Sequence, residues 1–579
     1  MSYNQGQREA TGPAPTPCQY EHWWRERQRQ ADQQRGRSPV RSTIIPSDRP
    51  MAIFDPNVFR LIEPPQRTID LEQGLQYSHS ESSPRNHITS VSLSSNFVLL
   101  EKASTPRHQA LPPKRYLRIV RRLWYSILAV YQRLFTLIFI VNLAAVLILL
   151  HCQSWDRSVA FKLDHLATLA SSNFLLAILF RQDWLINLLF RTAWLVPWSL
   201  PLRIRRIVSR VYCYGGIHSG AAVMGTLWWI VFTAVISWEG VARGNYTALI
   251  LVLTLSISSL LATVIILSLP HFRVRHHDTW ELTHRFLGWS SILLFWIQIL
   301  LLTHYNATTT TTTPSSSFGA RLIYTPTFYT LLAITFLLMY PWLLLRRWTF
   351  TATPLSPHAL RLSFPKKVHK YSCLVLSSSP LREWHPFATF PNVGPNGERN
   401  EGSLNGANSL VVSAAGDWTR NLIATAQREC REQKMLGKQG EGVEMKFWVK
   451  SHPRAGVLSL SCLYSRVLIV TTGSGIGPSL SSLLDRPQGQ VARLCWSTRS
   501  PLATYGEDML KLVEKADPEA LILNTDEMGR PDLLKVAYRL YVEMNAEAVF
   551  VLSNERVTRM VVGGLERGGV PAYGPIWDS

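Results

Sequence analysis

Hydrophobic and polar positions divide this chain of 579 residues into a polar N-terminal flank, a central apolar block and a mixed C-terminal part. Six apolar runs in the central block read as helices: Leu134–Leu150, Leu166–Phe180, Val211–Trp238, Tyr246–Leu269, Phe286–Leu302 and Leu322–Leu345. Several are long enough to cross about 30 Å of hydrocarbon at 1.5 Å per residue. The pattern predicts a multi-span α-helical membrane bundle of about six helices over residues 113–350.

The second of these runs is the least certain span. It is short, and Arg181 and Asp183 follow it directly. It either extends back to Phe161 or lies partly in the membrane interface together with Trp184–Phe190. The sequence leaves both arrangements open.

The flanks differ in character from the central block. Residues 1–112 are rich in Gln, Arg, Ser and Pro and show no apolar period, which predicts a disordered basic arm without a cleavable signal peptide. Beyond Pro365, β-rich runs alternate with helical stretches such as Glu507–Lys515 and Leu533–Met544. The runs are Tyr371–Leu376, Phe447–Lys450, Val467–Thr471, Ala492–Trp496, Ala520–Asn524 and Ala548–Leu552. This alternation predicts βαβ units and a parallel sheet in the later part, with a loop over residues 392–408.

Charge sets the predicted orientation. The net charge of +21 would suit nucleic acid or anionic lipid, but the basic residues cluster beside the apolar runs and no nucleic-acid motif accompanies them. Arg and Lys gather before the first run, between the second and third, and after the sixth, whereas the alternate loops carry few. This positive-inside pattern predicts a multi-pass protein with both termini in the cytosol. The seven cysteines include no close pair, so we expect neither a zinc site nor a disulfide framework.

A glycine-rich turn is the strongest local chemical signal. The β-rich run from Arg466 leads into TGSGIGP, which supplies Gly473, Ser474, Gly475, Gly477 and Pro478 before a short helical segment. Glycines let the backbone approach a pyrophosphate, and a helix N-terminus offers free N–H groups and a positive dipole. The turn therefore predicts a dinucleotide site, with an ordinary tight turn as the alternative.

Two shorter motifs precede this turn. The segment HPFAT places His385, Pro386, Phe387 and Thr389 close together beside a strand-like stretch. The segment GDWTR opens a helical run and contains three further candidates, which are Gly416, Trp418 and Thr419. Taken singly, each segment is as well explained by a plain turn or a helix cap.

The order of the three motifs resembles the ferredoxin-reductase-like module of ferric reductases and NADPH oxidases. The resemblance implies a β-barrel FAD domain over residues 351–460 and an α/β NADP domain over residues 461–579. It implies that the HPFAT residues line the flavin, that the GDWTR residues bind the FAD diphosphate, and that the glycine turn receives NADPH. The wider set of motifs, from THRFLGW (283–289) to GPIWDS (574–579), is similar to the fungal TmpA-type membrane flavoproteins.

Further nucleotide contacts follow from the same resemblance. Ser497 and Arg499 stand where the family reads the 2′-phosphate of NADPH, and the alternative for Arg499 is a solvated surface position. Gly529, Arg530 and Pro531 match another nicotinamide-nucleotide motif. In the tail, Trp577 is a candidate flavin contact or a packing residue.

The chain departs from this family in its histidines. Ferric reductases carry paired histidines fourteen positions apart on spans three and five, which sets two haems at two depths. Here His218 and His284 occur on those spans, but Phe232 and Gln298 occupy the positions fourteen residues on. The pair is thus a weak candidate for one inner haem or, alternatively, two interfacial structural histidines. An outer haem is not expected, and no other metal site is predicted.

A second departure lies before the glycine turn. The family's usual GPYG-like flavin turn is replaced by Ser451–Gly456. The sequence as a whole predicts a membrane-anchored flavin oxidoreductase that passes electrons from NADPH through FAD to an unidentified acceptor. The alternative is a non-catalytic membrane scaffold or signalling protein with a degenerate oxidoreductase fold.

Overall fold

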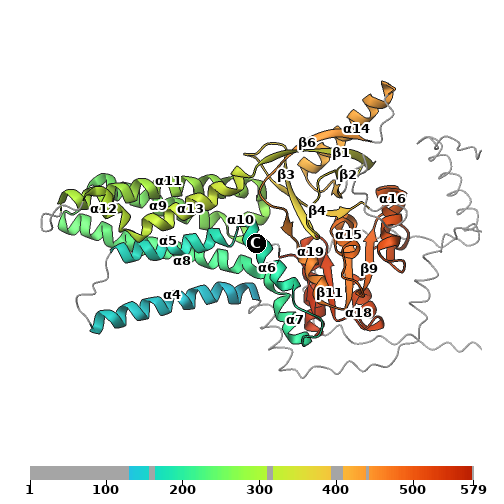
Figure 1. The fold of residues 1–579 in the computed structure, drawn as a ribbon, viewed down its shortest axis with the longest axis horizontal. Helices are drawn as coiled ribbons and strands as arrows, with labels where there is room; N and C mark the ends of the chain where they lie inside the picture. The colour runs from blue at the N-terminus through green and yellow to red at the C-terminus, as the bar shows by residue number, and fades with distance from the viewer. Residues whose placement is uncertain (1–129, 156–162, 310–316, 393–407, 438–441, 577–579) are drawn as a thin grey trace, which may run out of the picture. The chain divides into compact units, whose positions relative to one another are not determined.

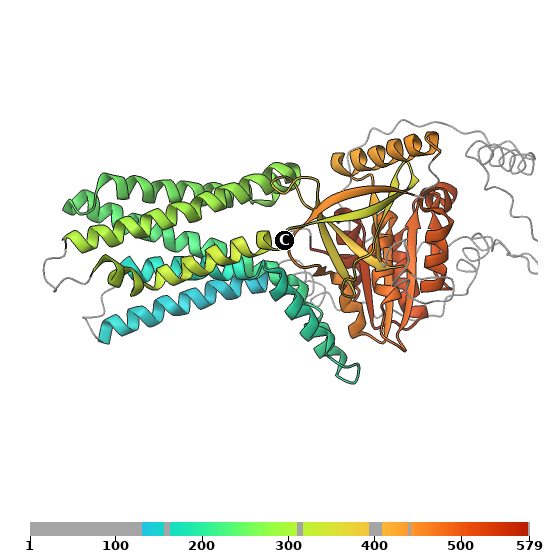
Figure 2. The same cartoon turned by 45° about the horizontal axis from the view of Figure 1, so that its top comes forward.

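The computed structural model describes residues 130–155, 163–309, 317–392, 408–437 and 442–576. The predicted basic arm, the Asn- and Gly-rich loop at 393–407 and the tail residue Trp577 lie outside the described residues. Figures 1 and 2 show helices in the first part of the described chain and strands with covering helices in the second.

Six long helices occupy the positions of the six apolar runs. They are α4 (Val130–Trp155), α5 (Leu163–Leu179), α8 (Gly215–Arg243), α9 (Ala248–Leu267), α11 (His277–Thr309) and α13 (Pro326–Leu343). Their shared core is built from buried apolar side chains such as Ile138, Leu166, Phe232, Ile257 and Ile334. By length and composition, five helices of the described chain could cross a membrane. A sixth is added if α5 and α6 (Asp183–Trp194), which meet at a bend of 64°, count as one span.

Small residues set the close packing of α4 on α8. A Cβ on Gly216 would meet the carbonyl oxygen of Tyr131, and one on Gly220 would come within 3.0 Å of the carbonyl oxygen of Phe135. These two glycines lie four positions apart and so share one face of α8. The backbones of the two helices can therefore approach as they do in small-residue membrane interfaces.

The first soluble domain is an antiparallel barrel. Its strands are β1 (Arg346–Ser356), β2 (Ala359–Phe364), β3 (Ser372–Ser377), β4 (His385–Pro391), β5 (Asn408–Ser413), β6 (Val443–Val449) and β7 (Arg454–Ala455). They pair in the order β4-β5-β2-β1-β6-β3-β7, and a further pairing of β4 with β3 closes six of them into a ring. Helix α14 (Asp417–Met435) packs on the barrel through Leu422, Ile423 and Ala426, which join the apolar core of the strands.

The second soluble domain is a parallel α/β sheet. Its strands are β8 (Arg466–Thr472), β9 (Val491–Thr498), β10 (Leu521–Asn524), β11 (Ala548–Leu552) and β12 (Ala572–Tyr573), in the order β10-β9-β8-β11-β12. Its helices are α15 (Ile476–Leu484), α16 (Pro501–Ala516), the short α17 (Thr525–Met528), α18 (Leu533–Glu543) and α19 (Glu555–Arg567). The chain leaves β8 first to one side and then to the other, so a topological switch point lies at the carboxyl end of β8.

The segment between α5 and α8 belongs to the soluble part. Helix α6 buries Ile186, Phe190 and Ala193 in the same apolar core as β8 and α15. Helix α7 (Leu202–Val208) follows, and its Arg205 forms a bidentate ion pair with Glu547 of the α/β domain. One of the two arrangements left open by the sequence placed Trp184–Phe190 at the membrane interface, whereas the structure gives this stretch a face that packs on protein.

Two small helices complete the bundle ends: α10 (Pro270–Arg275) precedes α11, and α12 (Phe318–Ile323) precedes α13. The predicted strands and helices of the last third coincide with β3, β6, β8, β9, β10, β11, α14, α16 and α18. Strands β1, β2 and β5 were not among the predicted runs. They belong to the barrel. β1 and β2 alternate apolar with polar residues, a strand pattern that was overlooked, whereas β5 is buried at four successive positions.

Candidate functional site

The two upstream motifs meet in one aromatic cluster. His385 opens β4 and Trp418 lies in the first turn of α14, and their rings stack with centroids 4.2 Å apart at an interplanar angle of 25°. Phe387 stands two residues along β4, with its ring 6.1 Å from that of Trp418. The indole Nε1 of Trp418 donates to the Ser378 hydroxyl at 3.0 Å, which fixes the plane of the ring. Motifs some thirty residues apart in sequence thus form one surface.

His385 carries an unpartnered polar atom in this cluster. Its Nε2 is buried and has no hydrogen-bond partner among the described residues. Burial lowers the pKa of its imidazole, with smaller opposing effects from Glu383 and Asp278. A neutral, buried ring nitrogen beside a flat indole fits a planar polar ligand such as an isoalloxazine ring.

The remaining residues of the two motifs have local partners. Pro386 is exposed on β4, while Thr389 is buried and donates its hydroxyl to the Ser372 carbonyl at 3.1 Å. Gly416 is the N-cap of α14. The Thr419 hydroxyl oxygen accepts from the backbone N–H groups of Ala415 and Gly416 at 3.0 and 2.9 Å. Thr419 thereby stabilises the start of the helix whose first N–H groups point toward a candidate phosphate site.

The glycine turn directly follows β8, at the switch point of the sheet. Gly473 has φ of 51°, a left-handed conformation that favours glycine, and its carbonyl accepts from Trp496 Nε1 at 2.9 Å. At Gly475 a Cβ would overlap the Thr471 hydroxyl and come within 2.9 Å of the Leu552 carbonyl oxygen. Ser474 lies between these glycines in a single 3-10 turn. The turn therefore needs glycine at both positions for its shape.

Helix α15 joins this turn to the barrel. It begins at Ile476, contains Gly477 and Pro478 in its first turn, and buries Leu480 and Leu483. These side chains share a core with Phe390 of β4 and Val411 of β5, and a Cβ on Gly477 would lie 3.7 Å from the Val411 side chain. The strand that carries His385 and the helix that follows the glycine turn are consequently held against each other.

The predicted phosphate readers lie at the carboxyl ends of the neighbouring strands. Ser497 is a buried residue of β9, and the exposed Arg499 follows the end of that strand. Gly529 comes after β10 with φ of 74°, and Arg530 beside it is exposed. Pro531 leads into α18, whose first turn is capped by the Asp532 carboxylate. Two exposed arginines thus follow adjacent strands at the sheet edge that carries the glycine turn.

The segment Ser451–Gly456, which stands where the resembled family has its flavin turn, is held by α6. Asn187 of α6 brackets β7, since its Nδ2 donates to the Pro453 carbonyl at 2.9 Å and its Oδ1 accepts from the Ala455 N–H at 3.0 Å. Arg454 pairs with Asp183 at 2.9 Å. The departure at Ser451–Gly456 therefore coincides with a contact between the barrel and α6.

The two histidines singled out in the bundle lie together. The rings of His218 on α8 and His284 on α11 have centroids 6.4 Å apart at an interplanar angle of 66°. The Nδ1 of His218 is 2.9 Å from the Ala177 carbonyl oxygen, and the Nδ1 of His284 is 3.4 Å from the Ser268 hydroxyl. With Nδ1 engaged, Nε2 of each ring remains as the ligand atom, as in metal-bound histidines oriented by a second partner. The positions of the two rings are compatible with one haem and equally with two structural histidines.

The positions fourteen residues after His218 and His284 are Phe232 and Gln298, and their surroundings differ from those of the two histidines. Phe232 stacks on Trp229 with ring centroids 4.6 Å apart, and Phe295 contacts Trp229 edge-on at 4.5 Å. Gln298 donates its Nε2 to the Thr254 hydroxyl at 2.6 Å. Among the described residues, no group of three or more His, Cys, Asp or Glu is placed to hold a metal ion.

Arg285, the residue after His284, contacts the segment that precedes HPFAT. Arg285 donates to the carbonyl oxygens of Leu381 and Arg382 at 3.1 and 3.0 Å, a few residues before His385. Nearby, the Lys450 ammonium lies over the Trp384 ring at 4.7 Å and the Trp342 ring at 5.2 Å. Burial lowers the pKa of Lys450 to about 8, with further lowering by Arg285. The end of the bundle that carries His284 and the start of β4 thus form one continuous contact.

Sequence reasoning missed the docking residues, chiefly Asp183, Asn187, Arg205 and Arg210. The two arginines were read as orientation charges. Arg210 instead pairs with Glu566, and its guanidinium lies 4.7 Å from the centre of the Tyr573 ring. The one available signal was the apolar spacing of Ile186, Phe190 and Ala193, which marks an amphipathic helix.

Comparison with known proteins gives relatives for most of the chain. The family described as "Adenylate-forming reductase 03009, C-terminal domain" matches residues 457–579. The chain is 36% identical over 469 residues to adenylate-forming reductase 03009 of Coprinopsis cinerea and 35% identical over 472 residues to adenylate-forming reductase 06235 of the same fungus. Each alignment covers 81% of this chain and 42% of the relative. The chain thus spans less than half the length of these curated relatives.

Solved structures are similar at a lower level. A flavohemoglobin from Malassezia yamatoensis with bound FAD and heme aligns at 12% identity and a TM-score of 0.29, covering 72% of this chain and 96% of its own. Ferredoxin-NADP+ reductase from Plasmodium falciparum with 2'P-AMP aligns at 10% identity and a TM-score of 0.26, covering 40% and 96%. At such scores these likenesses carry no functional argument. The similarity to TmpA-type proteins stays a prediction.

Proposed function

We propose that this chain is a membrane-anchored flavin oxidoreductase that takes electrons from NADPH through FAD to an acceptor not yet identified. FAD would supply the hydride chemistry, and the protein would bind and orient it. His385, Phe387 and Trp418 would hold the flavin ring, and the start of α14 would face its diphosphate. The word reductase in the names of the two fungal relatives agrees with this class of activity.

One observation carries the proposal. The glycine turn and the HPFAT strand belong to different domains, yet α15 packs directly on β4 and β5 through Ile476 and Leu480. A nucleotide on the turn and a flavin on β4 would therefore be bound by elements that are packed against each other. Hydride transfer needs such a fixed approach of two bound rings.

The nucleotide preference rests on charge. Arg499 and Arg530 follow neighbouring strands and are exposed at the edge that carries the glycine turn. A guanidinium pairs well with a phosphate, so these residues favour NADPH over NADH. Two acidic residues lie nearby, and each accepts a hydrogen bond. The Asp532 carboxylate caps α18, and the Asp526 carboxylate accepts from the Ser500 hydroxyl.

The orientation in the membrane is also part of the proposal. Basic residues flank the bundle at the end where α7 and β1 begin, and this positive-inside pattern supports cytosolic N and C termini. The helices are long and apolar enough for five or six spans. The acceptor would then receive electrons at the cytosolic face or in the inner leaflet, beside His284 and Arg285.

Spectroscopy of the purified full chain in lipid nanodiscs tests the function. We expect flavin absorption bands and their bleaching when NADPH is added without oxygen. Trp418→Leu should lower the FAD occupancy, whereas Trp448→Leu, on the barrel surface at β6, should leave it unchanged. Retention of flavin that NADPH does not bleach would exclude the reductase function.

The number of haems bound per chain is a separate prediction. We infer at most one haem per chain, between His218 and His284, because Phe232 and Gln298 replace the other two ligands. His218→Ala should remove any haem absorption band and leave the flavin bands. A content of two haems per chain would contradict this ligand assignment.

A second candidate is a non-catalytic membrane scaffold with a degenerate oxidoreductase fold. The observation that favours it is the docking of Ser451–Gly456 on α6 and on Tyr340 of α13, which diverts the segment that forms the family's flavin turn. A purified chain without any chromophore would support this candidate.

A further inference from the structure

The helical bundle contains a cavity that the proposed reductase does not use. It has a volume of about 810 Å³ and lies among α5, α8, α11, α12 and α13. It occurs at the end where α5 begins and α8 and α11 end, remote along those helices from His218 and His284. This volume falls within the range of sites that hold drug-sized molecules.

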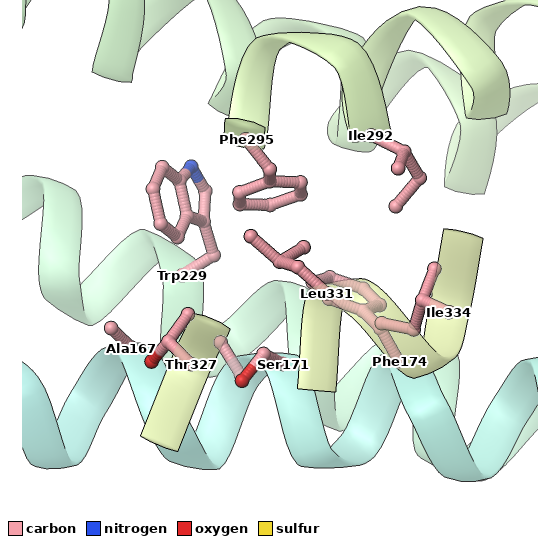
Figure 3. A pocket seen from close by; sticks show the side chains of 10 residues that line it. Ala167, Ser171, Phe174, Trp229, Ile292, Phe295, Thr327, Leu331 and Ile334 are labelled. Atoms are coloured by element: carbon pink, nitrogen blue, oxygen red, sulfur yellow. The ribbon is translucent and has the colours of Figure 1, made fainter. Parts of the chain in front are cut away.

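The inner wall of the cavity is aromatic. Trp229, Phe232 and Phe295 line it, and Trp229 and Phe295 also line a small neighbouring pocket of about 10 Å³. Figure 3 shows the Trp229 and Phe295 side chains beside each other, with Leu331 below them. Such walls suit a flat ring system, since aromatic pairs add to the free energy of burial.

Two buried polar atoms in this wall have no partner within the described chain. They are the Nε1 of Trp229 and the Oε1 of Gln298, on side chains that are 3% and 2% exposed. The orientation of the Gln298 amide is fixed, because the Thr254 hydroxyl donates to the Ile250 carbonyl at 2.7 Å and so must accept from Nε2. The free atom of Gln298 is therefore an acceptor, while Trp229 offers only a donor.

Charged side chains lie toward the mouth of the cavity. Asp164 and Glu239 line it together with Arg321, and Glu239 accepts from the Tyr246 hydroxyl at 3.3 Å. The lining thus carries two carboxylates and one guanidinium, an excess of one negative charge that disfavours an anion but not a neutral molecule. The aromatic wall and the negative charge of the lining together favour neutral ligands over acidic ones.

The geometry points to a binding site for a small, neutral aromatic molecule that carries a hydroxyl group. Its ring would lie against Trp229 and Phe295, and the hydroxyl, which both donates and accepts, would pair with Gln298 Oε1 and Trp229 Nε1. An acyl chain would fill the space but would leave both buried polar atoms unpaired, at a free-energy cost. This site is independent of flavin and nucleotide binding.

Binding of radiolabelled 2-naphthol to the full chain in nanodiscs tests the site, with 2-methoxynaphthalene as the matched probe that cannot donate a hydrogen bond. We expect saturable binding of 2-naphthol that is about fivefold tighter than that of the ether, as for one net hydrogen bond. This comparison uses the unmodified chain and does not depend on the folding of a variant. Absence of saturable 2-naphthol binding, or equal affinity for both probes, would overturn the proposal.

A pair of variants locates the bound molecule. Gln298→Leu should weaken 2-naphthol binding about fivefold. Gln182→Leu should leave it unchanged, because Gln182 is also buried with an unpartnered Oε1 but lies at the bend before α6, outside the cavity lining. Equal affinity of both variants would refute the assignment to this cavity.

Discussion

At the scale of single residues, the contact between Arg205 and Glu547 joins positions 342 apart in the sequence. The guanidinium is 6% exposed and the carboxylate 22% exposed, with N–O distances of 2.9 Å in both hydrogen bonds. Glu547 also accepts from the Ser465 N–H at 2.7 Å. Burial alone would raise the pKa of Glu547, but the hydrogen bonds from Arg205 and Ser465 outweigh it and lower the pKa to about 2.

Glu547→Gln should destabilise the α/β domain. Loss of the charge removes charge-assisted bonds to a buried guanidinium and should cost about 2 kcal/mol, or about 5 °C in the midpoint of thermal unfolding. Because the folded pKa is depressed, the stabilisation is present above the ordinary pKa of 4.5 and is lost as pH falls toward about 2. The difference in unfolding midpoint between the two proteins should therefore shrink below pH 4.5.

Glu543→Gln is the control for this variant. Glu543 pairs with Arg539 on the exposed surface of α18, where an ion pair contributes between zero and about 1 kcal/mol. Equal midpoints for the Glu543 and Glu547 variants at pH 7 would show that the buried pair does not stabilise the domain.

Arg499→Ala addresses the nucleotide. If Arg499 reads the 2′-phosphate, its loss should raise KM for NADPH about tenfold and leave KM for NADH unchanged. Arg466→Ala, at the opposite end of the neighbouring strand β8, serves as the control for a general loss of positive charge. A parallel rise in both KM values would assign Arg499 to the solvated surface.

At the scale of elements, α6 shows where sequence patterns reach their limit. Its apolar residues could be read as a weak span or as an interface helix, because both environments are apolar. The structure resolves the alternatives through the partner: Ile186 is 1% exposed in a core shared with β8, whereas Leu188 is 52% exposed. A pattern indicates which face is apolar, but the element that covers this face comes from distant sequence.

Ile186→Ala should destabilise the soluble part by about 3 kcal/mol, since it leaves a cavity in that core. Leu188→Ala removes a side chain of the same size from the exposed face and should cost less than about 1 kcal/mol. Thermal unfolding of the two variants in the same nanodiscs gives the comparison. Equal costs would mean that α6 does not pack on the soluble core in the way described.

The soluble elements were predictable to different degrees. Parallel strands such as Val467–Thr471 and Ala548–Leu552 are buried on both faces, so their uninterrupted apolar runs were visible in the sequence. The barrel strands β1 and β2 were overlooked, although polar residues such as Thr349, Thr351 and Arg361 alternate with apolar ones in them, as in a half-buried strand. The glycine turn was visible because its shape requires glycine locally, whereas the stacking of His385 on Trp418 depends on closure of the barrel.

For the whole molecule, the proposed orientation is open to chemical labelling. In right-side-out vesicles, Thr308→Cys at the end of α11 should react with a membrane-impermeant maleimide. Leu381→Cys, an exposed position before β4, should react only after permeabilisation. Mass spectrometry of the two peptides separates them from the native cysteines, and labelling of Leu381→Cys in intact vesicles would reverse the predicted orientation.

The two hydrogen bonds from Asn187 to the β7 segment have a practical consequence for truncation or domain exchange of this chain. A fragment that starts after α13 would lack α6 and α7, and would present the surfaces around Leu458, Tyr464 and Glu547 uncovered. The unit that must be transferred intact is discontinuous, made of residues 183–214 together with residues 346–576. Exchange of the barrel and the α/β domain between two such proteins would have to include the segment with α6 and α7, and would otherwise yield a module prone to aggregate.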